Sequence, residues 1–414
     1  MDIGNIAELN TFLLLDAIRS RGEATRRQLG RELGLSDASV SRIVKRLLAT
    51  GIIEELPGEG AVRGRTPSIL RFVGPAGAVI AVDLGGTRCH GALADLAGGP
   101  LATDFRQLGD DGDAAATLLR CIGALRSRAD GLAMPVRAVV VGIPALIDPA
   151  SQLATAGPNV HWQGFDLLGT LGARLAEPFE VDNDVNLAAL GEAWRGQGRG
   201  IQSFVTISIG TGIGGAVVID GHLVRGSHNA AGEVAYFPFW PAGGLRAAGQ
   251  PPGRRGFEDV ASGPALRARA ADLLAEGVPS SLDGGRFEVA DIFAAALRGD
   301  DAGGAVVREL VSHVAAVIVG ISALVDPQRI ILDGAIGRAL EPWLAQLRPS
   351  VAAAVFRPPD IVVSGLGQDA AVTGAIARAL AMVSELDVPA HLSRHVMRPA
   401  APPSQHDHRG AATP

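Results

Sequence analysis

The segment AVDLGGTRCH, residues 81–90, runs from a short apolar strand directly into Asp-Leu-Gly-Gly-Thr. Residues 79–82 predict a strand, Gly85 and Gly86 a turn, and GALADLAGG at 91–99 a returning strand. Because no helix follows the glycines, this is neither a Walker loop nor a Rossmann turn. Such a hairpin offers backbone N–H groups and the Thr87 hydroxyl to phosphate, with Asp83 placed to hold Mg²⁺ through water. A glycine hairpin that starts with Asp and has no phosphate-binding role is an alternative interpretation of the same residues. Further motifs are needed to decide between the two.

A second strand, glycine turn and strand occurs at FVTISIGTGIGGAVVIDG, residues 204–221. Two such hairpins predict two similar lobes that hold a phosphate chain from both sides. The residues at the second bend are Thr211, Gly212, Gly214 and Gly215.

Between the two hairpins, VDNDVNLAALGEAW at 181–194 predicts a strand that ends on Val181 and a helix that begins near Val185. At this junction Asp184 is placed to accept a proton from a hydroxyl group, and Asn183 to orient the same substrate. An Asx cap of the helix is the competing interpretation for either residue alone.

The first 73 residues read as a separate DNA-binding unit. Apolar residues at helical spacing predict a first helix that ends at Gly22, and Thr25-Arg26-Arg27-Gln28 reads as the capping box of a second helix running to about Leu33. After a tight turn at Gly34-Leu35, Ser36 caps a third helix, DASVSRIVKRLLATG. This is the helix-turn-helix pattern, in which the last helix enters the major groove. The candidate DNA-binding residues here are Thr25, Arg26, Ser36, Ser39, Ser41, Arg42, Lys45 and Arg46.

The segment GIIEELPGEGAVRGRTPSILRFV, residues 51–73, alternates like two strands around a basic, glycine-rich tip. It predicts a wing whose Arg63 and Arg65 enter the adjacent minor groove. Three helices that only pack or dimerise, beside a solvated arginine loop, are the alternative; a wing in the right place favours DNA binding.

Composition and charge agree with a globular protein of two or three domains. The 414-residue chain is 47% hydrophobic and has a net charge of −6, divided into +2 over residues 1–73 and −8 over the rest. The start MDIGNIAELN lacks the basic and apolar regions of a secretory signal, and the longest apolar run, residues 314–325, is too short to span a bilayer. We therefore expect a cytoplasmic protein. Cys89 and Cys121 form no CxxC pair, so neither a disulfide framework nor a cysteine zinc site is indicated.

Over residues 78–385 the chain resembles the ROK family (repressor, open reading frame, kinase), and residues 6–73 resemble its repressor branch. The family's segments occur here in order: DLGGT (83–87), VGIPALID (141–148), GPNVHW (157–162), VDNDVNLAALGE (181–192), GTGIGG (210–215), AGEVAY (231–236), FEDVASGPAL (257–266), IILDGAIG (330–337) and LGQDAAVTGAIARAL (366–380). The resemblance implies a two-lobed α/β fold of the actin-like, sugar-kinase (ribonuclease H-like) type, preceded by a winged helix-turn-helix domain.

The expected domain limits are a winged helix at 1–73, a linker at 74–77, a small lobe at 78–184 completed by a helix at about 370–388, and a large lobe at 185–369. The Pro-, Ala- and His-rich composition after these predicts a disordered tail at 389–414. The resemblance places in the sugar pocket Asn159, Asn183, Asp184, Glu233, Tyr236 and Glu258, with Asp184 as general base if the protein is a kinase. It places at the nucleotide Asp83, Gly85, Gly86, Thr87, Thr211, Gly212, Gly214 and Gly334.

Two departures from the family pattern concern its zinc site. The family's AGEIGH reads AGEVAY here, so Tyr236 replaces the zinc-binding, sugar-contacting histidine. The family's CxCGxxGC stretch is replaced by RAAGQPPGRRGFED at 246–259, which contains no cysteine. Zinc needs thiolate or imidazole ligands in tetrahedral number, so we expect no zinc and no required cofactor, although Mg-ATP remains a candidate ligand.

Three functions compete at this point. The leading hypothesis is a sugar-responsive transcriptional regulator, a repressor of carbohydrate genes, that binds operator DNA and a sugar as a homodimer or homotetramer. The alternative is an ATP-dependent sugar kinase that also binds DNA, and a scaffold that does not bind DNA ranks third. The DNA-binding segment, which a kinase does not need, decides the order.

Overall fold

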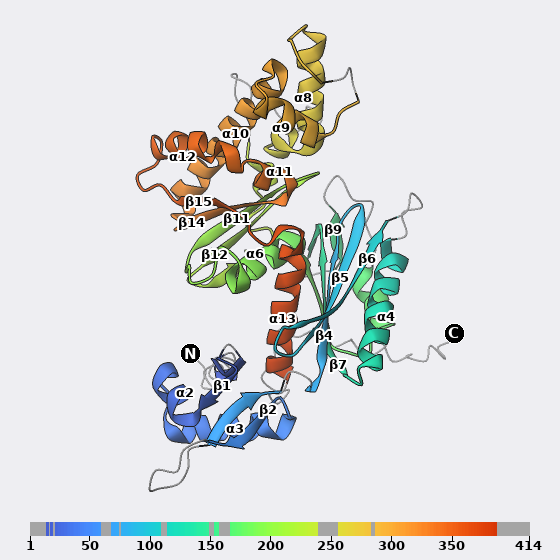
Figure 1. Ribbon diagram of the computed structural model, residues 1–414, viewed down its shortest axis with the longest axis vertical. Coiled ribbons are helices and arrows are strands. Elements are labelled where there is room, and N and C mark those ends of the chain that lie inside the picture. Colours follow the sequence, from blue (N-terminus) through green and yellow to red (C-terminus); the bar gives the residue numbers. More distant parts are fainter. Residues whose placement is uncertain are drawn as a thin grey trace, which may run out of the picture.

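The computed structural model describes residues 14–15, 17–19, 21–58, 68–73, 76–108, 114–148, 153–156, 166–238, 256–282 and 286–386. The molecule has three parts: a head that ends near residue 73, a small lobe and a large lobe (Figure 1). The last described helix of the chain returns from the large lobe to the small lobe. The head lies at the end of the molecule opposite helices α8–α10 of the large lobe.

The head has the predicted helix-turn-helix and wing. Residues 14–15 and 17–19 are helical, α2 spans Arg26–Leu33 and α3 spans Asp37–Thr50. The capping box at Thr25 and the Ser36 cap are both present, and Gly34 has the left-handed backbone that the turn requires. The wing strands are β2 (Ile53–Pro57) and β3 (Ser68–Phe72); a short strand that was not predicted, β1 (Glu23–Thr25), pairs with β3.

The small lobe is a five-stranded sheet in the order β10-β7-β4-β5-β6, with a helix on each face (Figure 1). Its apolar strands form because both faces are covered, one by α4 (Ala114–Gly131) and the other by α13 (Ala370–Leu386). The strands are β4 (Ala78–Leu84), β5 (Arg88–Asp95), β6 (Pro100–Gln107), β7 (Val136–Ile143) and β10 (Phe179–Asn183), joined by β8 (Ala145–Ile147), β9 (Ala154–Ala156) and α5 (Leu167–Gly172).

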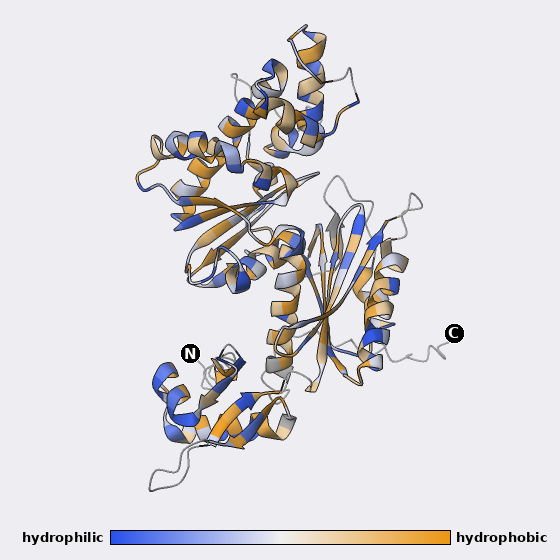
Figure 2. Ribbon diagram, viewed as in Figure 1, coloured by the Kyte–Doolittle hydropathy of each residue, from blue (hydrophilic) through white to orange (hydrophobic). Residues whose placement is uncertain are grey.

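The large lobe repeats this plan with a sheet in the order β13-β12-β11-β14-β15. In both sheets an antiparallel hairpin, β4–β5 or β11–β12, stands beside a parallel strand, β7 or β14. Figure 2 shows the strands of both sheets largely in the colour of hydrophobic residues, as expected for buried sheets. The strands are β11 (Phe204–Ile209), β12 (Ile213–Ile219), β13 (His222–Val224), β14 (Arg329–Asp333) and β15 (Asp360–Val363).

Helices pack on the large-lobe sheet around α10 (Asp301–Val325), a 25-residue helix that is long and apolar enough to cross a membrane. Here it is a core helix, because its buried side chains join the main hydrophobic cluster of the lobe. Its neighbours are α7 (Glu258–Ala261), α8 (Gly263–Ala275), α9 (Val289–Leu297), α11 (Gly334–Ala339) and α12 (Leu344–Ala352), with short 3₁₀ turns η2 (Val234–Tyr236), η3 (Glu341–Trp343) and η4 (Gly367–Asp369).

Helix α6 (Asp184–Arg195) joins the lobes and crosses α13 at very close range. Two glycines make this approach possible: a Cβ on Gly191 would lie 2.3 Å from the Ala370 carbonyl oxygen, and one on Gly374 would lie 1.6 Å from that of Leu187. The two-lobed fold predicted from the two hairpins is therefore confirmed, and its lobes meet at a glycine-mediated helix crossing.

Candidate functional site

Asp83 lies at the first glycine turn, at the end of a strand that is buried over its whole length. Its side chain is 7% exposed, and its Oδ1 atom is buried without a hydrogen-bond partner. Burial raises the pKa of Asp83 to about 6, against the opposing charge of Arg88, and the nearby Asp333 raises it further. A buried carboxylate oxygen without a partner suits a water-mediated Mg²⁺ ligand.

The turn that follows is open to a ligand. Gly86 and Thr87 are exposed, and a Cβ on Gly86 would meet nothing within 4 Å. The second turn is equally accessible at Thr211, where the Gly210 N–H donates to the Gly212 carbonyl at 2.9 Å. Both turns can present backbone N–H groups and a hydroxyl to an anion.

Gly214 and Gly334, both expected at the nucleotide, serve packing in this fold. A Cβ on Gly214 would lie 2.6 Å from the Val185 side chain of α6. Gly334 has φ +75°, and a Cβ there would lie 2.3 Å from the Ile209 carbonyl oxygen. Glycine is required at both positions whether or not a nucleotide binds.

At the junction between β10 and α6, the structure shows the Asx cap, while the roles of Asn183 and Asp184 toward a substrate stay a prediction. The strand runs two residues beyond the predicted Val181, and Asn183 is the helix cap, since its Oδ1 accepts from the backbone N–H groups of Val185 and Asn186 at 2.9 and 3.2 Å. Its side-chain amide is held 3.5 Å from the Ala145 carbonyl. Asp184 Oδ1 accepts from the Val185 N–H at 2.9 Å, and the residue as a whole is half-buried.

The structure brings together four of the predicted carboxylates from both lobes. The pKa of Asp184 is raised to about 8, first by burial and then by the charge of Asp83, with a smaller contribution from Glu233. The pKa of Glu233 is itself raised by burial and by Glu258. Glu258 Oε2 accepts from the Ile213 N–H at 2.9 Å, so this carboxylate is fixed to the second glycine hairpin. Such a cluster offers several acceptors to a ligand that presents several hydroxyls.

The raised pKa of Asp184 leads to a testable pH dependence. Because the folded pKa lies above the ordinary value of 3.8, the stability associated with the protonated carboxyl is present below about pH 4 and is lost as the pH rises through about 8. The free energy of unfolding of the wild type should therefore fall relative to that of Asp184→Asn between pH 6 and 9. Urea titrations of both proteins across this range test it; a constant difference between the two would contradict it.

Other site residues are placed less centrally or were missed. Tyr236 is 48% exposed in η2, and Asn159 lies outside the described residues. Sequence reasoning missed Asp333, which ends β14, and Arg338, whose Nη1 donates to it at 2.8 Å. The available signal was the segment IILDGAIG, in which Asp333 directly precedes Gly334.

On the head, α3 leaves Ser41, Arg42 and Lys45 exposed, while Ser39 and Arg46 are half-buried. Thr25 and Ser36 serve as helix caps. Arg26 pairs with Glu55 of the wing and donates to Ser68 Oγ at 3.0 Å, so this arginine joins the helix to the wing. Arg63 and Arg65 lie outside the described residues.

A groove of about 440 Å³ between α2 and α3 has a basic lining that includes Arg27 and Arg31, two residues absent from the predicted set. It is bordered by Arg26, Gly30, Leu35, Asp37, Val40 and Ser41. The two arginines are exposed on α2, the helix that crosses the DNA backbone in helix-turn-helix proteins. Their spacing on the outer face of the second predicted helix was the signal.

The cysteine-free segment that replaces the family's zinc loop lies largely outside the described residues, since 239–255 are not described. Among the residues that the structure does describe, no group of three or more His, Cys, Asp or Glu side chains is arranged to hold a metal ion.

Comparison with known proteins gives matches to both parts of the chain. A model of the ROK family matches residues 79–382, and a model of the MarR family matches residues 8–63. A xylose repressor of Caldicellulosiruptor bescii is 26% identical over 234 residues, which cover 56% of this chain and 59% of the relative; the chain thus matches under two thirds of that repressor's length.

Two solved structures extend the comparison. A ROK family transcriptional regulator, described as a homologue of the E. coli MLC protein, superposes with TM-score 0.80 at 24% identity over 92% of this chain and 98% of that one. A ROK family glucokinase from Streptomyces griseus, in complex with glucose and AMPPNP, gives TM-score 0.61 at 27% identity over 73% of this chain and 99% of that one.

Proposed function

The chain belongs to the ROK family, and from this we propose that it is a sugar-responsive DNA-binding regulator, a repressor of carbohydrate genes. The observation that carries the proposal is the presence, in one chain, of a winged head with an exposed basic helix and a two-lobed body with clustered carboxylates. The similarity to a xylose repressor supports this reading, and the similarity to a glucokinase solved with glucose supports a sugar as the ligand of the body.

For the head, Arg42→Ala should weaken binding to an operator selected from a random DNA library by about 1–3 kcal/mol, because a bidentate arginine–base contact contributes this much. Fluorescence anisotropy at fixed salt measures the loss. Arg298→Ala, an exposed arginine at the end of α9, is the control and should bind as the wild type does. Equal affinity of the Arg42 variant and the control would count against this helix as the DNA-reading element.

The contact between head and body offers a route for the sugar signal. One hydrophobic cluster contains Leu14 and Leu70 of the head together with Val383 of α13. Beside it, the Arg19 guanidinium of the head lies 5.9 Å from the ring centre of Trp194, near the end of α6. Because α6 begins at Asp184 and carries Trp194 near its other end, a shift of this helix on sugar binding changes the contact between Trp194 and Arg19 of the head. The sugar binds one arrangement of α6 and the head more tightly than the other, and so shifts the population toward it. Because the two arrangements differ in operator affinity, the sugar changes binding to DNA.

Trp194→Ala should accordingly uncouple the two ends. We expect sugar affinity and sugar-free operator affinity to change little, while the coupling between them, typically about 1–3 kcal/mol, falls toward zero. Operator titrations with and without saturating sugar measure the coupling. Trp343→Ala, which removes a tryptophan packed against Phe293 in the large lobe, is the matched control. Full coupling in the Trp194 variant would show that the signal takes another path.

A second candidate function is an ATP-dependent sugar kinase, which the retained Asp83, Thr87, Thr211 and Asp184 favour. Asp83 and the two glycine turns would hold the phosphates and Mg²⁺ of ATP, and Asp184 would accept the proton of a sugar hydroxyl. We propose that this activity is absent or residual and that neither ATP nor zinc is required. We further propose that the protein is cytoplasmic. We also propose that it forms a homodimer or homotetramer, because an operator with two half-sites is bound by two heads.

A further inference from the structure

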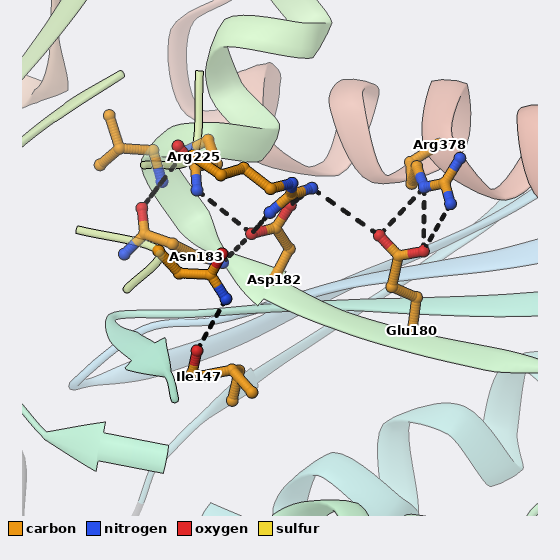
Figure 3. Close-up of polar contacts among 9 residues, drawn as sticks. Ile147, Glu180, Asp182, Asn183, Arg225 and Arg378 are labelled. Atoms are coloured by element: carbon orange, nitrogen blue, oxygen red, sulfur yellow. Dashed lines mark hydrogen bonds and ion pairs between the residues drawn. The ribbon is translucent and has the colours of Figure 1, made fainter. Parts of the chain in front are cut away.

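A loop from the large lobe is fastened to the small lobe directly beside the candidate sugar residues. It begins at Arg225, just after the edge strand β13, and ends at Gly232, directly before Glu233. Arg225 donates two parallel hydrogen bonds to Asp182 of β10, from Nη1 to Oδ1 at 2.9 Å and from Nη2 to Oδ2 at 2.7 Å (Figure 3). Further along, Asn229 Nδ2 donates to the Ile147 carbonyl of β8 at 2.8 Å. We call residues 225–232 the interlobe strap.

The carboxylate that receives the strap is built into the junction that carries Asn183 and Asp184. Asp182 is 5% exposed, and its Oδ1 also accepts from the Asn183 N–H at 2.8 Å and from Asn186 Nδ2 at 3.2 Å. One buried oxygen thus receives bonds from the large lobe, from the end of β10 and from the first turn of α6. A rotation of Asp182 would break its bonds to the cap residue Asn183 and to Asn186.

The electrostatics favour a fixed arginine at this position. Arg225 also lies 4.0 Å from Glu180, which is held on its other side by three hydrogen bonds from Arg378 of α13 at 2.7–3.0 Å (Figure 3). Two carboxylates therefore face one strap arginine. Burial lowers its pKa, but the hydrogen bonds from Arg225 to Asp182 and the charges of Asp182 and Glu180 raise it overall. Lysine would keep the charge but lose the parallel pair of bonds.

A backbone hydrogen bond joins the two ends of the strap, and its last residue, Gly232, makes a close backbone contact with β12. The Ala231 N–H donates to the Arg225 carbonyl at 3.1 Å, and Gly232 has φ +89°, with room for no Cβ because the Gly215 carbonyl oxygen would be 2.5 Å away. Glu233 follows immediately. The backbone that carries Glu233 is thus held at Gly232 by the close contact with β12 and, at the start of the strap, by the Arg225–Asp182 pair.

We propose that Arg225 is a positioning residue of the sugar site: through Asp182 it sets the Asn183–Asp184 junction of the small lobe against Glu233 of the large lobe. This proposal rests on the sugar binding proposed above. The Arg225–Asp182 ion pair lies outside the ligand pocket but sets how the two halves of the pocket are placed relative to each other. Small displacements of these halves have large effects on ligand affinity.

Isothermal titration calorimetry with D-glucose and D-xylose, on the full chain at a temperature where every variant is folded, tests the proposal. Arg225→Lys should raise the Kd of the sugar that binds by about tenfold, the size expected for a coupled hydrogen-bonded pair. Arg126→Lys is the matched control, because Arg126 makes a similar parallel pair with Glu177 within the small lobe, at 3.1 and 2.6 Å. It should leave the Kd unchanged.

A double-mutant cycle separates positioning from general stabilisation. If Arg225 acts by placing Glu233 and its partners, Arg225→Lys should change the Kd much less in a Glu233→Gln background than in the wild type. The positioning role is wrong if the Kd of the double variant changes by the product of the fold-changes of Arg225→Lys and Glu233→Gln. It is also wrong if Arg225→Lys alone leaves the Kd unchanged. Both results leave sugar binding itself intact. Binding of neither sugar by the wild type would instead count against the proposed function, and this inference with it.

Discussion

Glu233→Ala should abolish the sugar-dependent change in operator affinity while leaving binding to operator without sugar intact. Glu233 is expected to accept hydrogen bonds from sugar hydroxyls in the ground state, and it lies in the cluster with Asp184 and Glu258. A truncated side chain leaves buried hydroxyls of the ligand unsatisfied, at about 1–3 kcal/mol for each. Operator titrations by anisotropy, with and without the sugar identified by calorimetry, measure the response. A variant that still responds fully would remove Glu233 from the site.

Asp184→Asn is the informative counterpart, because a general base acts mainly in the transition state. The substitution keeps the shape and the acceptor of the bond to the Val185 N–H. A regulator should therefore retain most of its sugar response, losing about 0.5–1.5 kcal/mol for one hydrogen bond. A kinase would lose nearly all turnover. Sugar-dependent ADP release by the wild type that disappears in Asp184→Asn would make the chain a kinase first.

Gly374→Ala should lower the free energy of unfolding by at least about 3 kcal/mol, although alanine is the better helix former. The added Cβ would lie 1.6 Å from the Leu187 carbonyl oxygen, so α6 and α13 must move apart at their crossing. Rigid backbone, not a flexible side chain, is the neighbour, and no rotamer change relieves the clash. Urea unfolding followed by circular dichroism gives the free energy.

Gly123→Ala is the control for this substitution, since Gly123 lies on the exposed face of α4 and a Cβ there would meet nothing within 4 Å. It should stabilise the protein by about 0.5–1 kcal/mol through helix propensity alone. Opposite signs for the two glycine variants are the expected result. A Gly374 variant as stable as the Gly123 variant would mean that the helices do not cross as closely as the structure shows.

Local signals in the sequence determined the head and the two hairpins. The capping box at Thr25 and the Ser36 cap were predicted correctly because each involves hydrogen bonds between residues three apart. The strand, glycine turn and strand at residues 79–99 and 204–221 follow from alternation and turn chemistry within a few residues. The order of the motifs then fixed the family, and with it the two-lobed fold.

Only the tertiary structure decided which residues meet. Arg225 and Asp182 are 43 positions apart and Gly374 and Leu187 still further, so neither pairing is visible in any local pattern. The same holds for Asp333 beside Asp83, and for Arg19 of the head beside Trp194. The physical reason is that caps, turns and periodicity are satisfied within one or two turns of chain. An ion pair between lobes or a glycine crossing exists only after two sheets and the helices between them have packed.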